Sequence, residues 1–545
     1  MAEDGQAGGQ NGGTSGWSAE RSVAGRRNPW TIIAVISIAT FMVVLDSSIA
    51  NVALAHIAGG LAASYDEATW VITSFLVANA IVVPISGWLA DAIGRKRYYM
   101  ISVALFTIAS VLCGMAPNLA CLVIARVLQG IGGGGLAPVE QSMMVDTFPP
   151  SKRGAAFAAY GIVVIVGPIL GPSLGGWITD NYSWHWVFLI NLPIGILSLI
   201  LVSLFVAEPK ALVEARKKLA AKGLRIDWQG FVLVAVFLGC LEVTLDRGQR
   251  EDWFSSPMIV GFAIASFLAL IVFIPWEWTR NDPIVRIRLY GQRNFLIANI
   301  FMLLMGVIIF GTTQFIPQLL QEVLGYTATN AGLALTMGGL ATLVVMPIAG
   351  YLTGKVDARW LIGLALAIQG IALWNMSTLD TQMSFDNAAV ARMIQSIGLP
   401  FLFVPITNAA YVGLDPRQNN QASALMNVSR NLGGTFGISL VQTMLARREQ
   451  VHQSQYVESL NPLNPNYASG IDNMTHVFMN QGLSQIDAAQ AAVTHLYRTL
   501  GQQAAMLSYV DVFHTLMLIV FCTLPLVFLM QKPKKNAGGG GEAAI

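Results

Sequence analysis

The chain contains many apolar runs of about 20 residues, and this pattern restricts its fold more than any other feature. A helix needs about 20 apolar residues to cross the hydrocarbon core of a bilayer. Of the 545 residues, 54% are hydrophobic and only 11% are charged, whereas soluble proteins average roughly 25% charged residues. The sequence therefore predicts an all-α polytopic membrane protein.

The motifs of the first half recur in the second half. Segment 125–132 reads ARVLQGIG, and segment 391–398 reads ARMIQSIG. Segment 84–89 (PISGWL) is matched in the same way by segment 347–352 (PIAGYL). Such internal duplication is typical of transporters built from two similar helical halves.

Fourteen membrane spans are expected from the lengths of the apolar runs. Two of them, near 228–247 and 256–277, have no counterpart in the repeat and are interpreted as an inserted pair. An even number of spans places both termini on the same side of the membrane. The other spans are expected near 30–55, 67–90, 98–116, 118–142, 153–179 and 185–207, and near 294–321, 329–354, 358–377, 386–412, 418–446 and 507–530.

Five regions follow from this division of the chain. Region 1–28 is rich in Gly, Ser and Gln and is predicted to be a disordered tail. The others are an N-terminal six-helix half (29–208), a basic connector with the inserted helices (209–292), a C-terminal six-helix half (293–530) and a second tail (531–545).

Segment 447–506 is polar and is far longer than the other loops on its side of the membrane. It contains a helix-like stretch from Asp487 to Met506. A segment of this length suggests a partner protein. A flexible excursion is the alternative interpretation, because long loops are tolerated at little entropic cost.

The distribution of Lys and Arg predicts the orientation. Of the 32 such residues, 24 lie in segments on the side of the termini, 5 lie on the other side and 3 lie inside spans (Arg126, Arg392 and Arg430). Cytoplasmic loops carry the excess of these residues, so both termini are expected in the cytoplasm. All four cysteines fall in apolar segments, so no disulfide framework is predicted.

Two charged residues within the first half are candidates for proton coupling. A charge at membrane depth costs at least ~2.5–3.5 kcal/mol, which suggests a function for Arg126. Asp46 lies roughly 24 Å into the first span, where desolvation disfavours its charged form and favours proton loading and release. No acid stands at the equivalent position near Thr312. A helix-capping or solvated aspartate is the alternative for Asp46.

Other acids lie in the spans, but they are less readily connected to Arg126. Glu140 follows Arg126 by about 21 Å along the helix, which excludes a direct pair. Arg126 is expected to act on a neighbouring helix or to form a network with Gln129, and snorkelling to the outer interface is the alternative. Glu242, in the first inserted helix, is the other embedded acid and is kept as a coupling candidate.

A second cluster lies between the second and third spans. Gly87 and Gly94 permit a tight crossing of helices, and Asp91 faces basic residues at the cytoplasmic surface. This arrangement suggests a charge latch of Asp91 with Arg95 or Arg97 that holds one conformation. Ordinary basic flanking of a span is the alternative interpretation.

The fifth span carries small residues at every fourth position, which form a bare ridge for close helix contact. Its prolines favour a bend. We interpret it as a moving interface between the two halves, with simple packing as the alternative. The motif consists of Gly167, Pro168, Gly171, Gly175 and Gly176.

Taken together and in this order, these motifs resemble the major facilitator superfamily, and within it the fourteen-helix drug:proton antiporters of the EmrB/QacA type. The run 184–195 (WHWVFLINLPIG) adds to the resemblance, which covers nearly the whole chain. The resemblance implies the major facilitator fold, with Asp46 and Arg126 in proton coupling, Asp91 in gating and the fifth-span glycines in export. His185 and Pro172 depart from the usual pattern, and neither replaces a coupling residue.

The function implied by this resemblance is proton-driven export of hydrophobic or amphiphilic compounds by alternating access, from a bacterial inner membrane. No cofactor is expected besides the proton gradient. Segment 447–506 resembles the EmrB branch, which implies a periplasmic adaptor and an outer-membrane channel. Candidate residues of the substrate cavity are Phe41, Met42, Phe310, Gln314 and Trp374.

Two other classes of function remain open. A proton-coupled transporter of a specific metabolite or nutrient would want more polar residues in its cavity than the spans offer. An enzyme or receptor would need catalytic or ligand-binding clusters, and no His, Cys and Asp residues stand at metal-ligand spacing. Neither a bound metal nor a nucleic-acid partner is expected.

Overall fold

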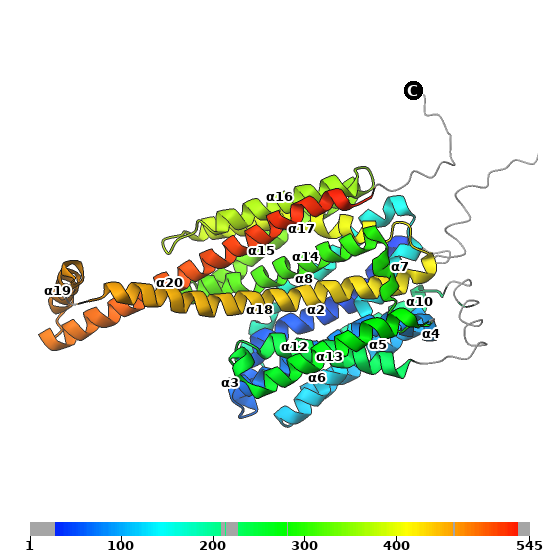
Figure 1. Ribbon diagram of the computed structural model, residues 1–545. Helices are drawn as coiled ribbons and strands as arrows, with labels where there is room; N and C mark the ends of the chain where they lie inside the picture. The colour runs from blue at the N-terminus through cyan, green and yellow to red at the C-terminus, as the bar shows by residue number, and fades with distance from the viewer. Residues whose placement is uncertain (1–27, 209–212, 214–226, 281, 462–463, 532–545) are drawn as a thin grey trace, which may run out of the picture.

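The computed structural model describes residues 28–208, 213, 227–280, 282–461 and 464–531. The predicted tails 1–28 and 531–545 and the basic connector lie almost entirely outside the described residues. The described chain is a bundle of long helices from which a helical hairpin projects at one end (Figure 1). This confirms the predicted all-α class.

The first half comprises eight helices and a one-turn helix. They are α2 (Pro29–Gly60), α3 (Tyr65–Ala68), α4 (Trp70–Ile93), α5 (Arg95–Gly114), α6 (Leu119–Gly134), α7 (Leu136–Thr147), α8 (Pro150–Asn181), α9 (His185–Leu189) and α10 (Asn191–Phe205).

The inserted pair and the second half follow. The pair is α12 (Trp228–Arg247) and α13 (Pro257–Thr279), with the 3₁₀ turns η1 (Trp253–Ser255) and η2 (Ile287–Gly291) beside α13. The second half comprises α14 (Arg293–Gln318), a π-helical turn η3 (Leu319–Val323), α15 (Ala328–Thr353), α16 (Ala358–Met376), α17 (Phe385–Ala410), η4 (Pro416–Gln418), α18 (Asn419–Ser459), α19 (Pro465–Asn480), α20 (Gln485–Thr523) and η5 (Leu524–Leu529).

Side-chain caps fix where several helices begin. The Oδ1 atom of Asn28 accepts a hydrogen bond from the N–H of Trp30 at 3.0 Å, and Pro29 occupies the first helical position of α2. Asn118 caps α6 in the same way, since its Oδ1 accepts from the N–H of Cys121 at 2.9 Å. Such caps satisfy backbone N–H groups that have no partner within the helix.

Twelve helical segments in the described part of the chain are long and apolar enough to cross a membrane. These include both inserted helices, at the predicted places. The helices α8 and α18 are not among the twelve, but both lie within the bundle, where α8 packs on α2 and α18 packs on α14. The total of fourteen spans stays a prediction.

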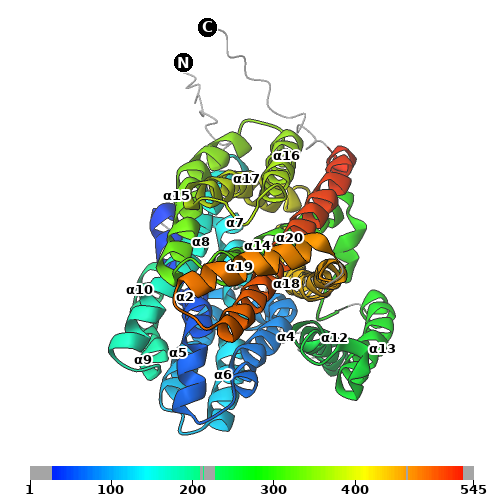
Figure 2. The same cartoon turned by 90° about the vertical axis from the view of Figure 1, so that its left-hand side faces the viewer.

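The internal repeat reappears in the packing of the helices. The pairs α2–α8, α4–α6 and α5–α6 of the first half correspond to α14–α18, α15–α17 and α16–α17 of the second half. Contacts between the halves are also paired, because α8 packs on α15 and α18 packs on α4. The inserted α12 and α13 pack on each other at the side of the bundle, where α12 contacts α4 and α18 (Figure 2).

Both ends of the described chain lie at the same end of the bundle, as an even number of crossings requires (Figure 1). We call this the terminal end, because Asn28 and Gln531 lie there, and the opposite end the hairpin end. Asn294, at the start of α14, donates to the carbonyl of Gln531. The indole of Trp30 lies 5.2 Å from the ring of Phe148, which follows α7 directly.

Segment 447–506 forms the projecting hairpin, and its described residues are mostly helical. Its first part continues α18, its middle holds α19, and its last part is the beginning of α20. The predicted helical stretch from Asp487 to Met506 therefore runs directly into the last span. At 1.5 Å per residue, the 41 residues of α18 extend about 60 Å, roughly twice the thickness of the hydrocarbon core. The flexible alternative is excluded for the described residues.

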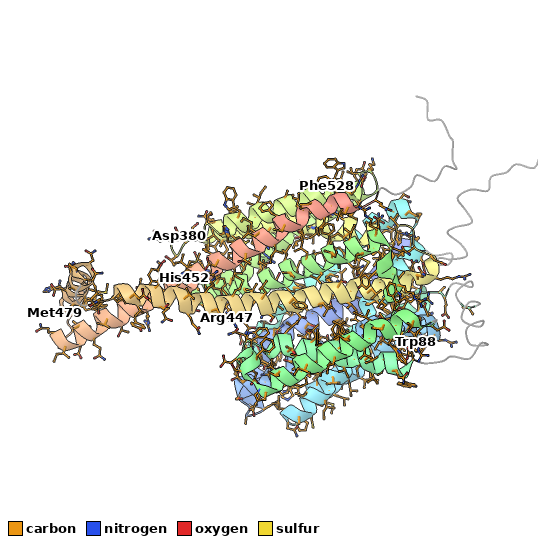
Figure 3. The ribbon with its side chains drawn as sticks, in the orientation of Figure 1. Trp88, Asp380, Arg447, His452, Met479 and Phe528 are labelled. Atoms are coloured by element: carbon orange, nitrogen blue, oxygen red, sulfur yellow. The ribbon has the colours of Figure 1, made fainter. Side chains whose placement is uncertain are left out.

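Polar contacts join α18 and α20 where the hairpin leaves the bundle. The Nε2 atom of His452 lies 2.9 Å from Oδ2 of Asp511, and Nε of Arg448 lies 3.6 Å from the same oxygen. Figure 3 shows His452 at this level, between the bundle and Met479 near the hairpin tip. The hairpin is thus fixed to the bundle by an ionic contact as well as by continuous helices.

Candidate functional site

The most extensive buried polar network surrounds Asp46, near the middle of α2. Its side chain is 0% exposed, and that of Arg126 on α6 is 1% exposed. An Nη atom of Arg126 donates to Oδ2 of Asp46 at 2.7 Å. The other carboxylate oxygen accepts from Nε2 of Gln129 at 2.8 Å and from Nδ2 of Asn191 at 2.7 Å. Three donors from two other helices therefore hold one carboxylate.

Arg126 is held as firmly as Asp46. Its Nε donates to the carbonyl of Val71 at 2.9 Å, and an Nη atom donates to Oε1 of Gln129 at 2.7 Å. The guanidinium carbon lies 4.3 Å from the ring centre of Phe75 and 5.6 Å from that of Phe188, distances at which aromatic faces attract cations. These contacts exclude the snorkelling alternative.

The second half has the same arrangement without the carboxylate. Arg392 donates to Thr312 at 3.1 Å and to Gln395 at 2.6 Å. The separation between the arginine and its α2 or α14 partner is 80 residues in both halves. Thr312 thus occupies the place of Asp46, as the sequence predicted. Only the first half neutralises its buried arginine with a carboxylate at this position.

A second site closes the terminal end between the two halves. The backbone of Asn420 and Gln421 on α18 approaches Gly87 so closely that a Cβ there would lie 3.0 Å from their atoms. The Nδ2 of Asn420 also donates to Asp91. The close crossing predicted at Gly87 is present, and its partner is α18 of the opposite half.

The charge latch differs from the prediction in its direct bonding partners, although the charges of Asp91 and Arg95 also act on each other. Asp91 is hydrogen bonded to Asn420, whereas Arg95 forms its ion pair with Asp146 at the end of α7. Asp146 also accepts from Nδ2 of Asn419 at 2.8 Å. Arg97 is exposed. Two carboxylates therefore reach α18, and Arg95 supports one of them from within its own half.

The conformation of Gly94 explains why two charged groups so close in sequence take different partners. Gly94 ends α4 with φ of +102°, a value that glycine adopts without steric cost. The chain reverses there, so that α5 begins directly at Arg95.

Helix α7 contributes further contacts to this closure. Ser142 donates to Oδ1 of Asn420 at 2.6 Å, and Oε1 of Gln141 accepts from Nδ2 of Asn427 at 2.7 Å. We refer to the bonds of Asn420 and Asn427 with Asp91, Gln141 and Ser142 as the terminal-end contacts. Sequence reasoning missed the α7 and α18 members. The available signal was a polar side chain within a predicted span.

The glycine ridge of α8 packs on α2. A Cβ at Gly167 would lie 2.8 Å from Val44, and a Cβ at Gly171 or Gly175 would meet Ser48 or Ile49. These contacts lie within the first half, so the predicted interface between halves is wrong for this ridge. Two other glycines of the same helix, at 154 and 161, face α15 across the halves.

Pro172, which departs from the usual pattern of this motif, removes a backbone hydrogen bond from α8. Pro172 has no N–H, so the carbonyl of Pro168 lacks its usual helical partner. Ser48 of α2 donates to that carbonyl at 3.5 Å.

The last glycine of the motif, Gly176, has no atom within 4 Å of where a Cβ would lie, so it does not contribute to the ridge.

Glu242 lies away from the Asp46 network, on α12. It is buried, and both its carboxylate oxygens lie within 3.1 Å of the hydroxyl of Thr435 on α18. Asp246, one turn later, accepts from Thr73 of α4. Helix α12 therefore bridges the two halves with acidic side chains.

The candidate residues of the substrate cavity do not form one wall. Met42 is fully buried in the core, and Phe41 is partly buried against a separate cluster around Leu45. Phe310 and Gln314 are exposed one turn apart on α14. Trp374 is 60% exposed on α16, which packs on α17 and α20.

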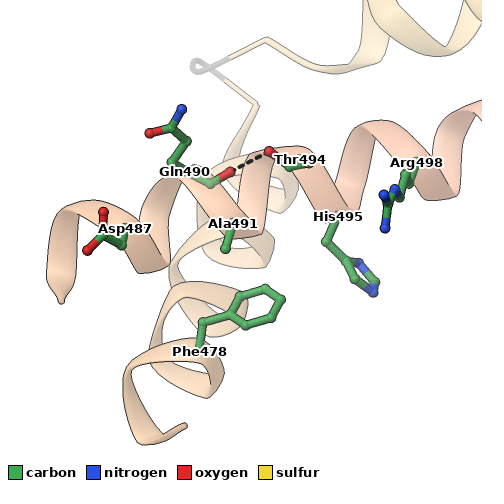
Figure 4. Close-up of a pocket in the computed structure, with 7 residues that line it drawn as sticks. All are labelled: Phe478, Asp487, Gln490, Ala491, Thr494, His495 and Arg498. Atoms are coloured by element: carbon green, nitrogen blue, oxygen red, sulfur yellow. Dashed lines mark hydrogen bonds between the residues drawn. The ribbon is translucent and has the colours of Figure 1, made fainter. Parts of the chain in front are cut away.

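An open pocket of about 510 Å³ lies on the hairpin, between α19 and the start of α20 (Figure 4). The rings of Phe478 and His495 face each other across it, with centres 6.1 Å apart. It is remote from Asp46, so it is no part of the buried network. Its lining is Phe478, Asp487, Gln490, Ala491, Thr494, His495 and Arg498.

This architecture, two similar helical bundles with an ion pair buried inside the first, is typical of a polytopic membrane protein of the transporter type. Residues 36–438 match the Major Facilitator Superfamily. The chain belongs to this superfamily, and the predicted resemblance is confirmed.

Relatives and solved structures agree with this assignment. The chain is 39% identical to the Multidrug export protein EmrB of Escherichia coli (strain K12) over 510 residues, which are 93% of this chain and 96% of that protein. It is 42% identical to the protein of the same name from Haemophilus influenzae over 431 residues, which are 79% and 83% of the two chains. The solved proton:xylose symporter XylE superimposes with a TM-score of 0.58 at 14% identity, covering 92% of this chain and 99% of that one.

Proposed function

We propose that this protein is a proton-driven exporter of hydrophobic or amphiphilic compounds, in a bacterial inner membrane with both termini in the cytoplasm. The proposal rests chiefly on the Asp46–Arg126 pair, a buried carboxylate in contact with a cation on a neighbouring helix. Small separations of such a pair change the proton affinity of the acid strongly. The relatives named multidrug export proteins support the choice of cargo and direction.

Transport would proceed by alternating access, with fourteen spans arranged as two rocking halves. In the present conformation the terminal-end contacts join the halves. Opening of the terminal end would admit a compound from the cytoplasm, and protonation of Asp46 would weaken its ion pair with Arg126. The proton gradient would supply the energy, and no enzymatic activity or bound cofactor is part of the proposal.

Reconstituted vesicles test this function directly. Inverted vesicles with an acidic interior should accumulate a lipophilic cationic dye such as ethidium and lose protons as they do so. The variant Asp46→Asn serves as the control, since it should insert normally but fail to concentrate the dye. A transporter of a polar nutrient would neither move the dye nor respond to it. Dye accumulation without a proton gradient would exclude the antiport mechanism.

We also propose that the hairpin binds an elongated periplasmic adaptor that leads to an outer-membrane channel. Helices α18 and α20 carry it well beyond the bundle (Figures 1 and 3). Its surface presents apolar side chains to solvent, among them Ile486 at 80% exposure, Val477 and Tyr497. Isolated exposed residues are common, but several together on one projecting element are typical of interaction sites.

Deletion of segment 447–506, with a short Gly-Ser linker in its place, tests the adaptor. We expect the variant to lose compound resistance in intact cells but to retain transport in reconstituted vesicles, where no adaptor is needed. A matched control replaces Val477, Ile486 and Tyr497 by serine, which leaves α18 and α20 continuous. Equal loss in cells and vesicles would mean that the segment is needed for folding or for transport itself.

A further inference from the structure

Glu140, near the start of α7, is a fully buried carboxyl group that the mechanism above does not use. Its side chain is 0% exposed. One oxygen, Oε2, accepts a hydrogen bond from Thr40 of α2 at 2.6 Å. The other oxygen, Oε1, has no hydrogen-bond partner among the described residues. Asp46, by contrast, receives one cationic and two amide donors.

The helices packed against α7 do not bring a cation into contact with Glu140. Its titratable neighbours are Tyr99 of α5 and Tyr160 of α8. Arg430 of α18 interacts with Tyr160 and not with Glu140 directly. Among the other charged groups of these helices, Asp46 is paired with Arg126, Asp91 with Asn420, Arg95 with Asp146, and Arg153 with the main chain at Val145 and Phe148.

A neutral carboxyl group suits this environment better than a carboxylate. An ionised carboxylate buried without a cation is very costly, and such a group binds a proton instead. The hydroxyl of Tyr99 already donates its proton to the carbonyl of Ile36 at 2.6 Å. It has none left for Glu140, but its oxygen can still accept one from a protonated carboxyl group.

We propose that Glu140 is a second proton-binding site of the transporter and that it holds a proton while the terminal end is closed. This inference rests on the proposed proton-driven transport and adds a second titrating group to it. Asp46 and Glu140 then have complementary states in this conformation, since one carboxyl group is paired with arginine and the other is neutral.

The position of Glu140 links its proton to the movement of the halves. The next two residues, Gln141 and Ser142, make terminal-end contacts with Asn427 and Asn420 of α18. Separation of α7 from α18 would therefore admit water next to Glu140. Water stabilises the carboxylate, so the proton leaves toward the terminal side only when that end opens.

The test counts the protons released when ethidium binds to the full chain purified in detergent, at a series of pH values. Glu140→Gln keeps the shape of the neutral side chain but cannot titrate. We expect it to bind ethidium and to release one proton fewer per bound ethidium than the wild type. Thr147→Ala is the control for structure, because it removes only a side-chain hydrogen bond within α7, to the carbonyl of Met143, and leaves the carboxyl group and the terminal-end contacts in place, so its proton count should be unchanged.

Glu140→Asp separates titration from packing, since it keeps an ionisable group at the same place. It should restore the missing proton, with release at a different pH. Wild-type protein that releases no protons would overturn the proposed function itself. A wild type that releases protons together with an equal count in Glu140→Gln would overturn the second site alone, and so would a Glu140→Asp variant that fails to restore the proton.

Discussion

Asp46 and Thr312 stand at equivalent places in the two halves, and each contacts an arginine 80 residues later in the chain. The partners differ in one respect that matters for chemistry, because a carboxylate can bind a proton and a threonine hydroxyl cannot. A buried ion pair contributes little net stability, although breaking it by removing one partner costs roughly 3–5 kcal/mol. This combination favours a coupling role for Asp46 over a purely structural one.

A double-mutant cycle at Asp46 and Arg126 separates stability from coupling. Asp46→Asn should lower the stability of the purified protein by about 3–5 kcal/mol, because it leaves Arg126 buried without a counter-charge. The second change Arg126→Gln should recover much of that loss, since neither group is then charged. Thermal unfolding in detergent measures the stability, and vesicle transport measures the coupling.

Coupled transport should be absent in the single variant and in the double variant. Recovery of active dye accumulation by the double variant would mean that the carboxylate does not carry the proton. Asp46→Glu should retain part of the activity with a shifted pH optimum, because it keeps a titratable group beside Arg126.

The residues that could be predicted at this scale were those on a single helix. Arg126 and Gln129 are three residues apart, so helical geometry alone places them on one face. The contribution of Asn191 depends on how α10 packs beside α2, which one sequence does not specify. Asp91 was recognised from the glycines and basic residues next to it in the sequence, but its partner Asn420 lies 329 residues away.

Helix α8 shows how one element carries two kinds of contact. Its glycines at 167, 171 and 175 pack on α2, while those at 154 and 161 face α15 in the other half. The ridge therefore joins α8 to α2 as one rigid pair, and the second set forms the boundary across which the halves meet. The packing of α18 on α14 and α4 repeats this arrangement.

Substitution of Gly171 by alanine tests the contact between α8 and α2. The added methyl group would collide with Ser48, and overpacking of this kind typically costs about 1–3 kcal/mol. We expect a lower unfolding temperature for Gly171→Ala. Gly176→Ala is the matched control, because it adds the same methyl group five residues later into open space. Equal effects of the two variants would contradict the ridge contact.

The spans could be predicted from apolar length, whereas the hairpin could not. A prediction from hydropathy places the end of a span where polar residues begin. Segment 447–506 was therefore interpreted as a loop. The backbone hydrogen bonding of α18 and α20 continues through that boundary, since polar helices are stable in water when they pack on each other. His452 and Asp511, which join the two helices, are separated by 59 residues and form no local sequence motif.

At the scale of the whole molecule, the two halves meet through polar contacts at the terminal end. Most of these contacts involve a side-chain amide of Asn419, Asn420 or Asn427 on α18. A hydrogen bond between neutral groups is worth about 0.5–1.5 kcal/mol, and one to a charged group such as the carboxylates of Asp91 and Asp146 about 1.5–3 kcal/mol. Together they hold one conformation without making it irreversible, which alternating access requires.

An exchange of Asp91 and Asn420 tests this closure. Asn420→Asp alone would oppose two carboxylates, and their repulsion should separate the halves at the terminal end and impair transport. Asp91→Asn alone keeps an acceptor for Asn420 and should slow transport without loss of inserted protein. The double exchange restores one amide donor and one carboxylate with reversed positions, so it should recover much of the activity.

Accessibility of a cysteine placed at Ser142 to a thiol reagent, in a background without the four native cysteines, measures opening of the terminal end. We expect faster labelling in Asn420→Asp and near-normal labelling in the double exchange. Labelling at the same rate in all variants would show that Asp91 and Asn420 do not control this end.

Helix α18 runs without a break from Asn419, at the terminal-end contacts, to Ser459 on the hairpin. A stiff rod of this length is a lever arm. If the half tilts by about 15°, the size of a typical rigid-body rotation, a point roughly 30 Å from the pivot is displaced by about 8 Å. In the proposed transport cycle, the tip of the hairpin would therefore move by more than the length of a side chain when the terminal end opens. A protein bound to that tip would be displaced with it in each transport cycle.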